Sequence, residues 1–181
     1  MMGLLSAAVA VVLGADGTVL QLDASNKRST VSYSVTHKFH KVTGVTHDVQ
    51  GAAKILPDGT AQIQVRAQVV SFDSDNGNRD SHMKETVEAA KYPDVTVKCL
   101  AKLSGTTSQK ATADCDVNLH GVSQKMSVPV ELTFDNPTTV HAVGAFPVSW
   151  DGFKITRPQL LFVPIEDRGD VSFDLRFAGG P

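Results

Sequence analysis

The sequence predicts an all-β fold of about eight antiparallel strands and one short helix. Apolar and polar residues alternate with a period of two from residue 18 to residue 177, which is typical of strands with one buried face. Turn signals such as Pro-Asp-Gly at 57–59 separate most of the alternating runs. A sheet of this many strands with one wet face either closes into a barrel or packs as a sandwich.

The strands follow one another along the chain as alternating runs. The predicted runs are 31–39, 45–55, 61–69, 95–103, 111–119, 126–134, 140–150 and 171–177. Pro129 and Pro147 lie inside two of these runs. Because proline has no N–H to donate to a neighbouring strand, we expect those strands to be edges, bulged or interrupted there.

One helix is expected at about residues 79–90. Asn78 or Asp80 would cap its start, and the Tyr-Pro pair at 92–93 would end it. No repeat, linker or low-complexity tract divides the chain. Residues 16–181 are therefore expected to form a single domain.

The only long apolar run of the chain is residues 4–13. It is too short to span a bilayer, which needs about 20 residues, but its length suits the core of a signal peptide. Small residues follow at Gly14 and Ala15, so residues 1–15 are interpreted as a signal peptide. No Lys or Arg precedes the run. Either the true start lies upstream, or the run is a first strand or helix of the domain.

Composition and charge argue against several function classes. The chain has 17 Lys and Arg against 19 Asp and Glu, a net charge of −2, which gives no support for nucleic-acid binding. No block of like charge could act as a membrane-surface tail. A hydrophobic content of 41% is ordinary for a folded domain, so disorder is not expected.

The predicted inward face carries many alanines and valines. An eight-stranded barrel is just wide enough to be filled by its own side chains or to hold one small ligand. Small inward residues favour a ligand cavity, and the alternative is a core filled by Phe, Trp and Tyr from other strands. The expected lining residues are Val35, Val65, Val97, Val117, Val130 and Phe146.

The two cysteines, Cys99 and Cys115, lie on the apolar face of consecutive strands. A hairpin centred on Thr107 would place them directly opposite each other, because each is equally far from that residue. Opposed residues of a non-hydrogen-bonded pair have Cα atoms about 4.5 Å apart, which a disulfide accepts. A cross-strand disulfide is expected if the protein is exported, and two reduced core thiols are the alternative.

Histidines and a charged cluster are the candidate polar groups. His37 and His47 share the apolar parity of their strands and could both face inward, to ligate a metal or to bind a polar ligand head. A zinc site needs three or four converging ligands, so satisfied interior histidines are the alternative. Arg79 and Asp80 with His82 could form an acid–base group or simply fasten the helix across the barrel mouth. No nucleophile elbow, phosphate-binding loop or metalloprotease helix motif occurs.

Residues 151–165 break the period of two, and we expect them to fold over an opening of the barrel. The segment carries Phe153 and Phe162 beside the cations Lys154 and Arg157. Such a mixture suits an amphiphile with its apolar tail inside and an anionic head at the rim. The alternative is an ordinary long loop packed on the core.

Several stretches carry a family resemblance when they are taken in order. A strand that ends in His, Tyr-Ser-Val-Thr-His at 33–37, is followed by Gly44 and Gly51. The most specific stretches are Asn-Arg-Asp-Ser-His-Met at 78–83 and Lys-Tyr-Pro-Asp-Val-Thr-Val-Lys at 91–98. Asp-Val-Asn-Leu-His-Gly-Val at 116–122 ends a strand in a Gly-Val turn. Together these stretches resemble the YceI-like family of exported bacterial proteins.

The resemblance implies an antiparallel, lipocalin-like barrel that is open at one end and located in the periplasm or secreted. It implies a non-catalytic protein that binds a polyisoprenoid, an isoprenoid quinone or a fatty-acyl chain, with no other cofactor. The charge balance and the short apolar run add the expectation of no nucleic-acid partner and no membrane segment after cleavage. Thr46 and residues 156–159 depart from the family pattern, so the rim near 151–165 is expected to differ. The candidate ligand contacts are Tyr33, Val35, His37, Phe39, His47, Val65, Arg79, His82, Val97, Val117, Val130, Phe146, Phe153, Arg157 and Phe162.

Two rival hypotheses remain open at this point. One is a metal protein or enzyme that uses the histidines, and the other is a structural or stress-related interaction domain with a filled barrel. A strand left as an edge would also allow a homodimer.

Overall fold

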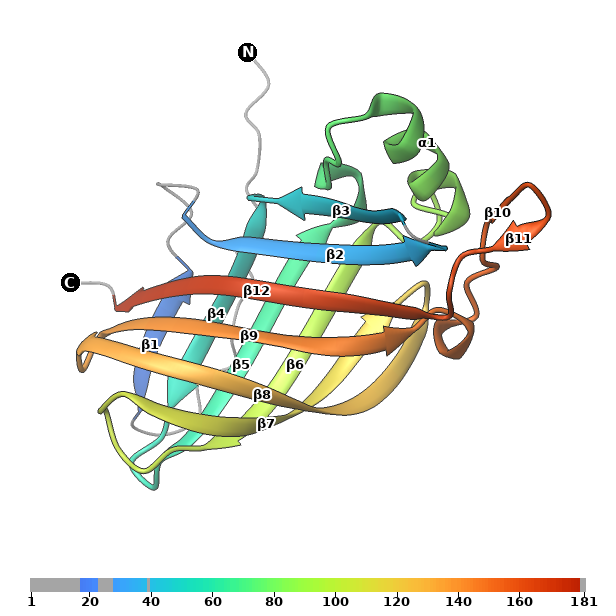
Figure 1. Ribbon diagram of the computed structural model, residues 1–181. Coiled ribbons are helices and arrows are strands. Elements are labelled where there is room, and N and C mark those ends of the chain that lie inside the picture. Colours follow the sequence, from blue (N-terminus) through green and yellow to red (C-terminus); the bar gives the residue numbers. More distant parts are fainter. Residues whose placement is uncertain (1–16, 23–27, 39, 180–181) are drawn as a thin grey trace, which may run out of the picture.

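The computed structural model describes residues 17–22, 28–38 and 40–179, and its strands wrap into a closed antiparallel barrel (Figure 1). The predictions for residues 1–15 and for Phe39 lie outside this described part. The barrel strands are β1 (Thr18–Leu22), β4 (Val49–Ile55), β5 (Thr60–Gln68), β6 (Asp94–Lys102), β7 (Gln109–Leu119), β8 (Val122–Asn136), β9 (Thr139–Ser149) and β12 (Arg168–Gly179). The predicted all-β, eight-stranded barrel is therefore confirmed.

A hairpin of two more strands, β2 (Thr30–His37) and β3 (His40–Thr46), extends the sheet beyond the barrel. The long strand β12 allows the sheet both to close into a barrel and to carry the β2–β3 hairpin. One edge of β12 pairs with β9 throughout, while its other edge pairs with β2 between Gly169 and Asp174 and with β1 from Phe177 to Gly179. The barrel thus closes at one end of β12, and the hairpin branches from the other end.

Pro129 and Pro147 limit the pairing between β8 and β9, but they leave the β7–β8 and β9–β12 pairings intact. Pro129 pairs opposite Thr112 of β7, and Pro147 pairs opposite Asp170 of β12, so neither strand ends at its proline. The ladder between β8 and β9, however, runs only from Val130 to Asn136 of β8. Residues 122–129 of β8 and 145–149 of β9 are therefore not paired with each other, as expected where proline cannot donate.

The single α-helix of the described residues, α1 (Gly77–Thr86), begins and ends earlier than the sequence predicted. Its N-cap is Asn76, whose side chain accepts a hydrogen bond from Arg79 N at 3.1 Å. The predicted cap Asp80 instead lies inside the helix, where its buried carboxylate accepts hydrogen bonds from Ser74 N and Oγ. None of the described helices is long and apolar enough to span a membrane.

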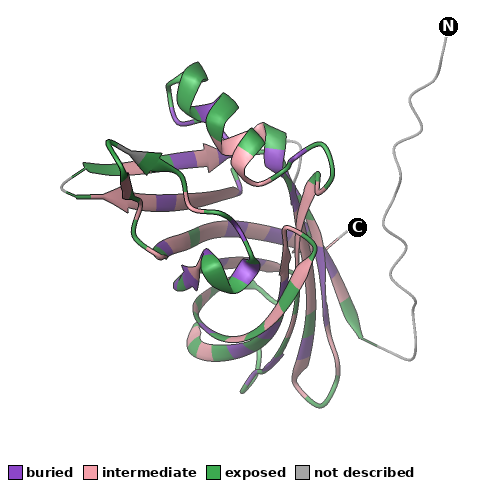
Figure 2. Cartoon of the chain, turned by 90° about the vertical axis from the view of Figure 1, so that its right-hand side faces the viewer, coloured by how far each residue is buried: buried purple, intermediate pink, exposed green. Residues whose placement is uncertain are grey.

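The barrel end near α1 is covered by the segment that follows β9. This segment contains the short 3₁₀ turn η2 (Asp151–Phe153), and it buries Trp150, Phe153 and Ile155 in the main hydrophobic core. Figure 2 views this end and shows the turn lying across the barrel. The expectation that residues 151–165 fold over an opening is thus met by 151–155. The rest of the segment forms a projecting hairpin of β10 (Gln159–Leu160) and β11 (Val163–Pro164).

Candidate functional site

The interior of the barrel contains a cavity of about 180 Å³ that is lined entirely by apolar side chains and the two cysteines. All eight barrel strands contribute to it, because every one of them turns an apolar face inward. Of the predicted lining residues, the following lie on the cavity: Val65, Val97, Val117, Val130 and Phe146. Val35 does not line the cavity and packs instead against the adjoining core.

Small and large side chains are unevenly distributed around this cavity. Most of the lining alanines project from β4, β5, β6 and β7, whereas the phenylalanines that strands contribute project from β8, β9 and β12. The alanines are Ala53, Ala61, Ala67, Ala101 and Ala113, with Ala142 on β9, and the phenylalanines are Phe134, Phe146, Phe173 and Phe177, with Phe72 outside the strands. A dry apolar cavity of about 150 Å³ accepts a benzene ring. The cavity therefore has room for part of a hydrocarbon chain, and a long tail would require the lining side chains to rearrange.

The cysteines form a disulfide in the cavity wall. Cys99 of β6 and Cys115 of β7 are directly paired in register, with Cα atoms 4.0 Å apart and sulfurs 2.02 Å apart. Both residues line the cavity, and Cys115 is buried. The bond therefore joins two central strands at mid-barrel.

The predicted histidine pair is not brought together. His40 lies opposite His37 in the β2–β3 ladder, so His47 lies beyond the far end of β3, about 20 Å away along the strand. His37 Nε2 donates to the carbonyl of Val163 at 3.2 Å, and His47 is exposed. In the described ranges, no group of three or more His, Cys, Asp or Glu side chains is placed to hold a metal.

The charged residues at the start of α1 hold the loop that precedes the helix. Both Arg79 and His82 are exposed, and the Arg79 guanidinium donates to Ser74 O at 2.6 Å and to Ser74 Oγ at 3.3 Å. The hydrogen bonds from Ser74 lower the pKa of Asp80, the other member of the motif. Through Arg79 and Asp80, the cluster at 79–82 thus ties the start of α1 to the preceding loop, whereas the sequence predicted either an acid–base group or a cluster that fastens the helix across the barrel mouth.

Tyr33 lies on the inner face of β2 and links the hairpin to the segment before α1. Its ring packs against Phe72, with the centroids 5.5 Å apart, and over Gly44, where a β-carbon would collide with it. Burial raises the pKa of Tyr33 to about 12, and the negative charge of Asp80 adds to the effect. Its hydroxyl therefore stays protonated at neutral pH.

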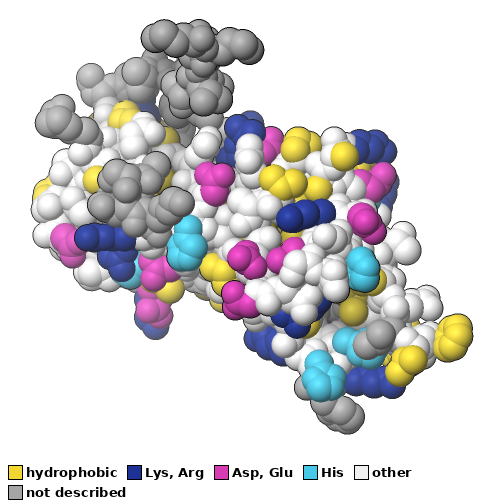
Figure 3. All heavy atoms as spheres, turned by 90° about the horizontal axis from the view of Figure 1, so that it is seen from above, with side chains coloured by type: hydrophobic (Ala, Val, Ile, Leu, Met, Phe, Trp, Pro, Cys, Tyr) yellow, Lys and Arg dark blue, Asp and Glu magenta, His cyan; other side chains and the backbone are white. Residues whose placement is uncertain are grey.

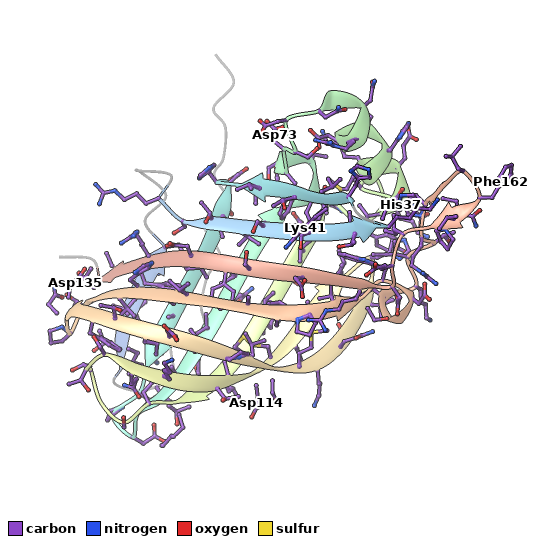
Figure 4. All side chains as sticks on the ribbon, viewed as in Figure 1. His37, Lys41, Asp73, Asp114, Asp135 and Phe162 are labelled. Carbon is purple, nitrogen blue, oxygen red and sulfur yellow. A yellow bond between two sulfur atoms is a disulfide. The ribbon has the colours of Figure 1, made fainter. Side chains whose placement is uncertain are left out.

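The remaining predicted residues of 151–165 have three different environments. Phe153 is 0% exposed and belongs to the core that closes the barrel end. Arg157 pairs with Asp151 at 2.8 Å and donates to Ile165 O at 2.8 Å, so it holds this segment together. Phe162, by contrast, points away from the barrel at the tip of the β10–β11 hairpin and is 96% exposed (Figure 4).

His120, for which the sequence predicts no role, joins three elements at the covered end. Its Nδ1 lies 3.1 Å from Phe153 O, and its Nε2 lies 2.7 Å from a carboxylate oxygen of Glu88. The ring also contacts the edge of Tyr92. His120 and Gly121 both have positive φ angles in the turn between β7 and β8. The His-Gly pair at the end of a predicted strand is therefore the sequence feature that could have indicated this turn.

The fold and the cavity together define a class of proteins. An eight-stranded antiparallel barrel with one apolar internal cavity is the architecture of lipocalin-type proteins. A family model described as the YceI-like domain matches residues 21–177, and the chain belongs to this family. No curated protein matches the sequence.

Solved structures of low sequence identity share the fold. A polyisoprenoid binding domain from Saccharophagus degradans aligns with a TM-score of 0.72 at 15% identity, covering 91% of this chain and 100% of the other. BcnA from Burkholderia cenocepacia aligns with a TM-score of 0.70 at 19% identity, covering 86% and 98%. The YceI protein of Campylobacter jejuni aligns with a TM-score of 0.60 at 18% identity, covering 81% and 89%.

Proposed function

We propose that this chain is an exported, non-catalytic binding protein that holds the tail of an amphiphilic lipid inside the barrel. The tail would be a polyisoprenoid, the side chain of an isoprenoid quinone, or a fatty-acyl chain. The observation that carries the proposal is the cavity, whose lining offers no polar group from any of its strands. Such a lining selects hydrocarbon, and each methylene group removed from water contributes about 0.8 kcal/mol.

Two further observations support the proposal. The chain belongs to the YceI-like family, and one solved structure with the same fold is described as a polyisoprenoid binding domain. The Cys99–Cys115 disulfide is typical of oxidising compartments, which supports export to the periplasm or out of the cell.

The polar head of the ligand would lie at the end of the barrel near η2. An apolar cavity cannot satisfy a phosphate, hydroxyl or carboxylate, so the head must remain outside it. At this end the cover is a short segment, residues 150–155, and β8 and β9 are unpaired beside it. The opposite end is formed by the tight connections at 56–59, 103–108 and 137–138.

The proposal is tested by native mass spectrometry of the mature protein produced with export, followed by solvent extraction and lipid analysis. We expect one bound lipid per chain, lost on denaturation, and rebinding of a polyprenol, a quinone or a fatty acid by the delipidated protein. β3 ends the strand order of the sheet, so the same spectrum also tests the homodimer that an open edge would allow.

A matched pair of variants locates the lipid. Ala142 and Ala145 both lie on β9, but Ala142 lines the cavity whereas Ala145 faces outward. Ala142→Phe should fill the cavity, abolish lipid binding and lower the free energy of unfolding by about 1–3 kcal/mol. Ala145→Phe should bind lipid as the wild type does. Equal binding by both variants, or a wild-type chain that stays empty when offered all three lipids, would contradict the proposal. A stoichiometric metal mass would favour the histidine hypothesis instead.

A further inference from the structure

The tip of the β10–β11 hairpin carries the two most exposed large apolar side chains of the described residues. Leu161 is 77% exposed and Phe162 is 96% exposed. Figure 3 shows hydrophobic side chains at the outermost point of this end, with Lys or Arg and His side chains beside them. The tip therefore presents a small apolar surface to the surroundings, away from the barrel.

The backbone of this tip is unfavourable for the residues that it contains. Leu161 has φ 52° and Phe162 has φ 64°, so both are in the left-handed region. A two-residue hairpin turn of this kind prefers Asn-Gly, because non-glycine residues with large side chains are crowded there. Folding alone would favour small polar residues at both positions. Backbone strain together with exposed apolar side chains is typical of a functional segment.

The base of the hairpin is held against the end of β2. Glu166 N donates to Thr36 O at 3.0 Å, and the His37 ring donates to Val163 O at 3.2 Å. Arg157 adds a hydrogen bond to Ile165 O at 2.8 Å. The tip is therefore presented in a fixed direction and does not fold back to cover its own apolar side chains.

Two exposed cations lie on the segments next to this hairpin. Lys38 follows His37 in the β2–β3 turn, and Lys154 follows η2. Both are exposed, and within the described ranges neither has an ion-pair partner, whereas Arg157 is paired with Asp151. Glu166 and Asp167 are the acidic side chains of the hairpin base without an ion pair to a described residue, and the carboxylate of Asp167 accepts hydrogen bonds from Ser149 Oγ and Asp151 N. Lys38 and Lys154 are therefore available to an anionic surface at this end of the molecule.

We propose that the β10–β11 hairpin docks this protein on a bilayer surface that contains anionic lipids. Leu161 and Phe162 enter the boundary between headgroups and acyl chains, and Lys38 and Lys154 meet lipid phosphates. A protein partner fits less well, since a stable protein interface buries about 1,000 Å² or more and a two-residue tip offers far less. The docked hairpin places the η2 end of the barrel toward the membrane. This inference does not depend on which ligand the barrel holds.

The test is flotation of the full mature protein with phosphatidylcholine vesicles, with and without phosphatidylglycerol. The double variant Leu161→Asn, Phe162→Gly provides the ideal turn pair, so it should be at least as stable as the wild type. Its vesicle partitioning should fall about 100-fold, because each apolar side chain contributes about tenfold when it leaves water. Leu100→Asn, which removes an apolar side chain 55% exposed on the outer face of β6, is the matched control and should partition as the wild type does.

The cations are tested separately. Lys38→Gln and Lys154→Gln should each lower binding to the phosphatidylglycerol vesicles by about fivefold and leave binding to pure phosphatidylcholine unchanged. Phe162→Trp should show a blue shift of its emission on adding vesicles, since the one native tryptophan, Trp150, is buried. The proposal is overturned if the wild type binds neither kind of vesicle, or if the Leu161→Asn, Phe162→Gly variant binds vesicles as well as the wild type does. It is also overturned if the only effect of this double variant is to dissociate a dimer seen by sedimentation equilibrium.

Discussion

The indole ring of Trp150 lies against Gly169 of β12, at a distance that leaves no room for a β-carbon. The contact seals the barrel end, because the same ring is part of the buried core that holds Phe153. The glycine at 169 thus allows the covering segment to reach the strand that closes the barrel.

Gly169→Ala should therefore destabilise the protein by about 1–3 kcal/mol, since the added methyl group forces the indole to move. Chemical denaturation followed by Trp150 fluorescence measures the change. Gly77→Ala is the control: nothing lies near its missing β-carbon, and it lies in a helix, so a gain of about 0.4–1 kcal/mol is expected. A neutral Gly169→Ala substitution would show that the ring is not held in place.

Removal of the disulfide should lower stability by about 3 kcal/mol in the chain-entropy model for a loop of this length. The cysteines are 16 residues apart and join two central strands. Denaturant unfolding with and without reductant measures the loss. The Cys99→Ala, Cys115→Ala variant should unfold at the reduced midpoint in both conditions, and sensitivity of that variant to reductant would contradict the interpretation.

His120→Ala should loosen the cover of the barrel end and lower the free energy of unfolding by about 1–2 kcal/mol, because Phe153 O and Glu88 Oε2 lose their hydrogen bonds to the ring. Hydrogen exchange of the amides in 150–155 should accelerate more than exchange elsewhere. His141→Ala, which removes a partly exposed pair with Asp174 on the outer face of the barrel, should cost less than about 1 kcal/mol and leave that exchange unchanged. Equal exchange in both variants would remove the assigned role of His120.

Alkaline pH should destabilise the fold through Tyr33. The pKa of Tyr33 is raised to about 12 in the folded chain, so its contribution to stability is complete below the unfolded value of about 10 and is lost as the pH rises toward 12. In a Tyr92→Phe variant Tyr33 is the only tyrosine, and its ultraviolet absorbance should titrate near 12. Titration near 10 would contradict the burial of its hydroxyl, and Tyr33→Phe should remove the alkaline component.

The sequence predicted the number of barrel strands correctly but not their membership. The run at 31–39 was counted as a barrel strand, yet β2 lies in the branching hairpin, whereas β1 was missed. Both have alternating residues, and alternation reports a buried face without reporting the neighbour that covers it. The role of β1 depends on its long-range pairing with β12, which no local pattern contains.

The inward valines and the cysteine register were predictable, because a strand period of two carries over directly into a regular hairpin. The positions of the histidines were not predictable. The inward position of His47 was inferred from the strand alternation, but β3 ends at Thr46, so the alternation does not apply to His47. The roles of Arg79 and Arg157 were also out of reach, because both bind backbone carbonyls whose positions depend on loop conformation. Phe162 was expected near the ligand because hydrophobicity alone does not distinguish a buried ring from a projecting one.

Pro129 and Pro147 have one more consequence. Along residues 122–129 and 145–149, β8 and β9 share no ladder hydrogen bonds, and the η2 segment lies against both strands. This stretch is a seam that can widen without breaking backbone pairing. At this end the barrel is therefore held together by the packing of Trp150 and Phe153 rather than by ladder hydrogen bonds between β8 and β9, so under the proposed function these two side chains would decide how thick a tail can enter.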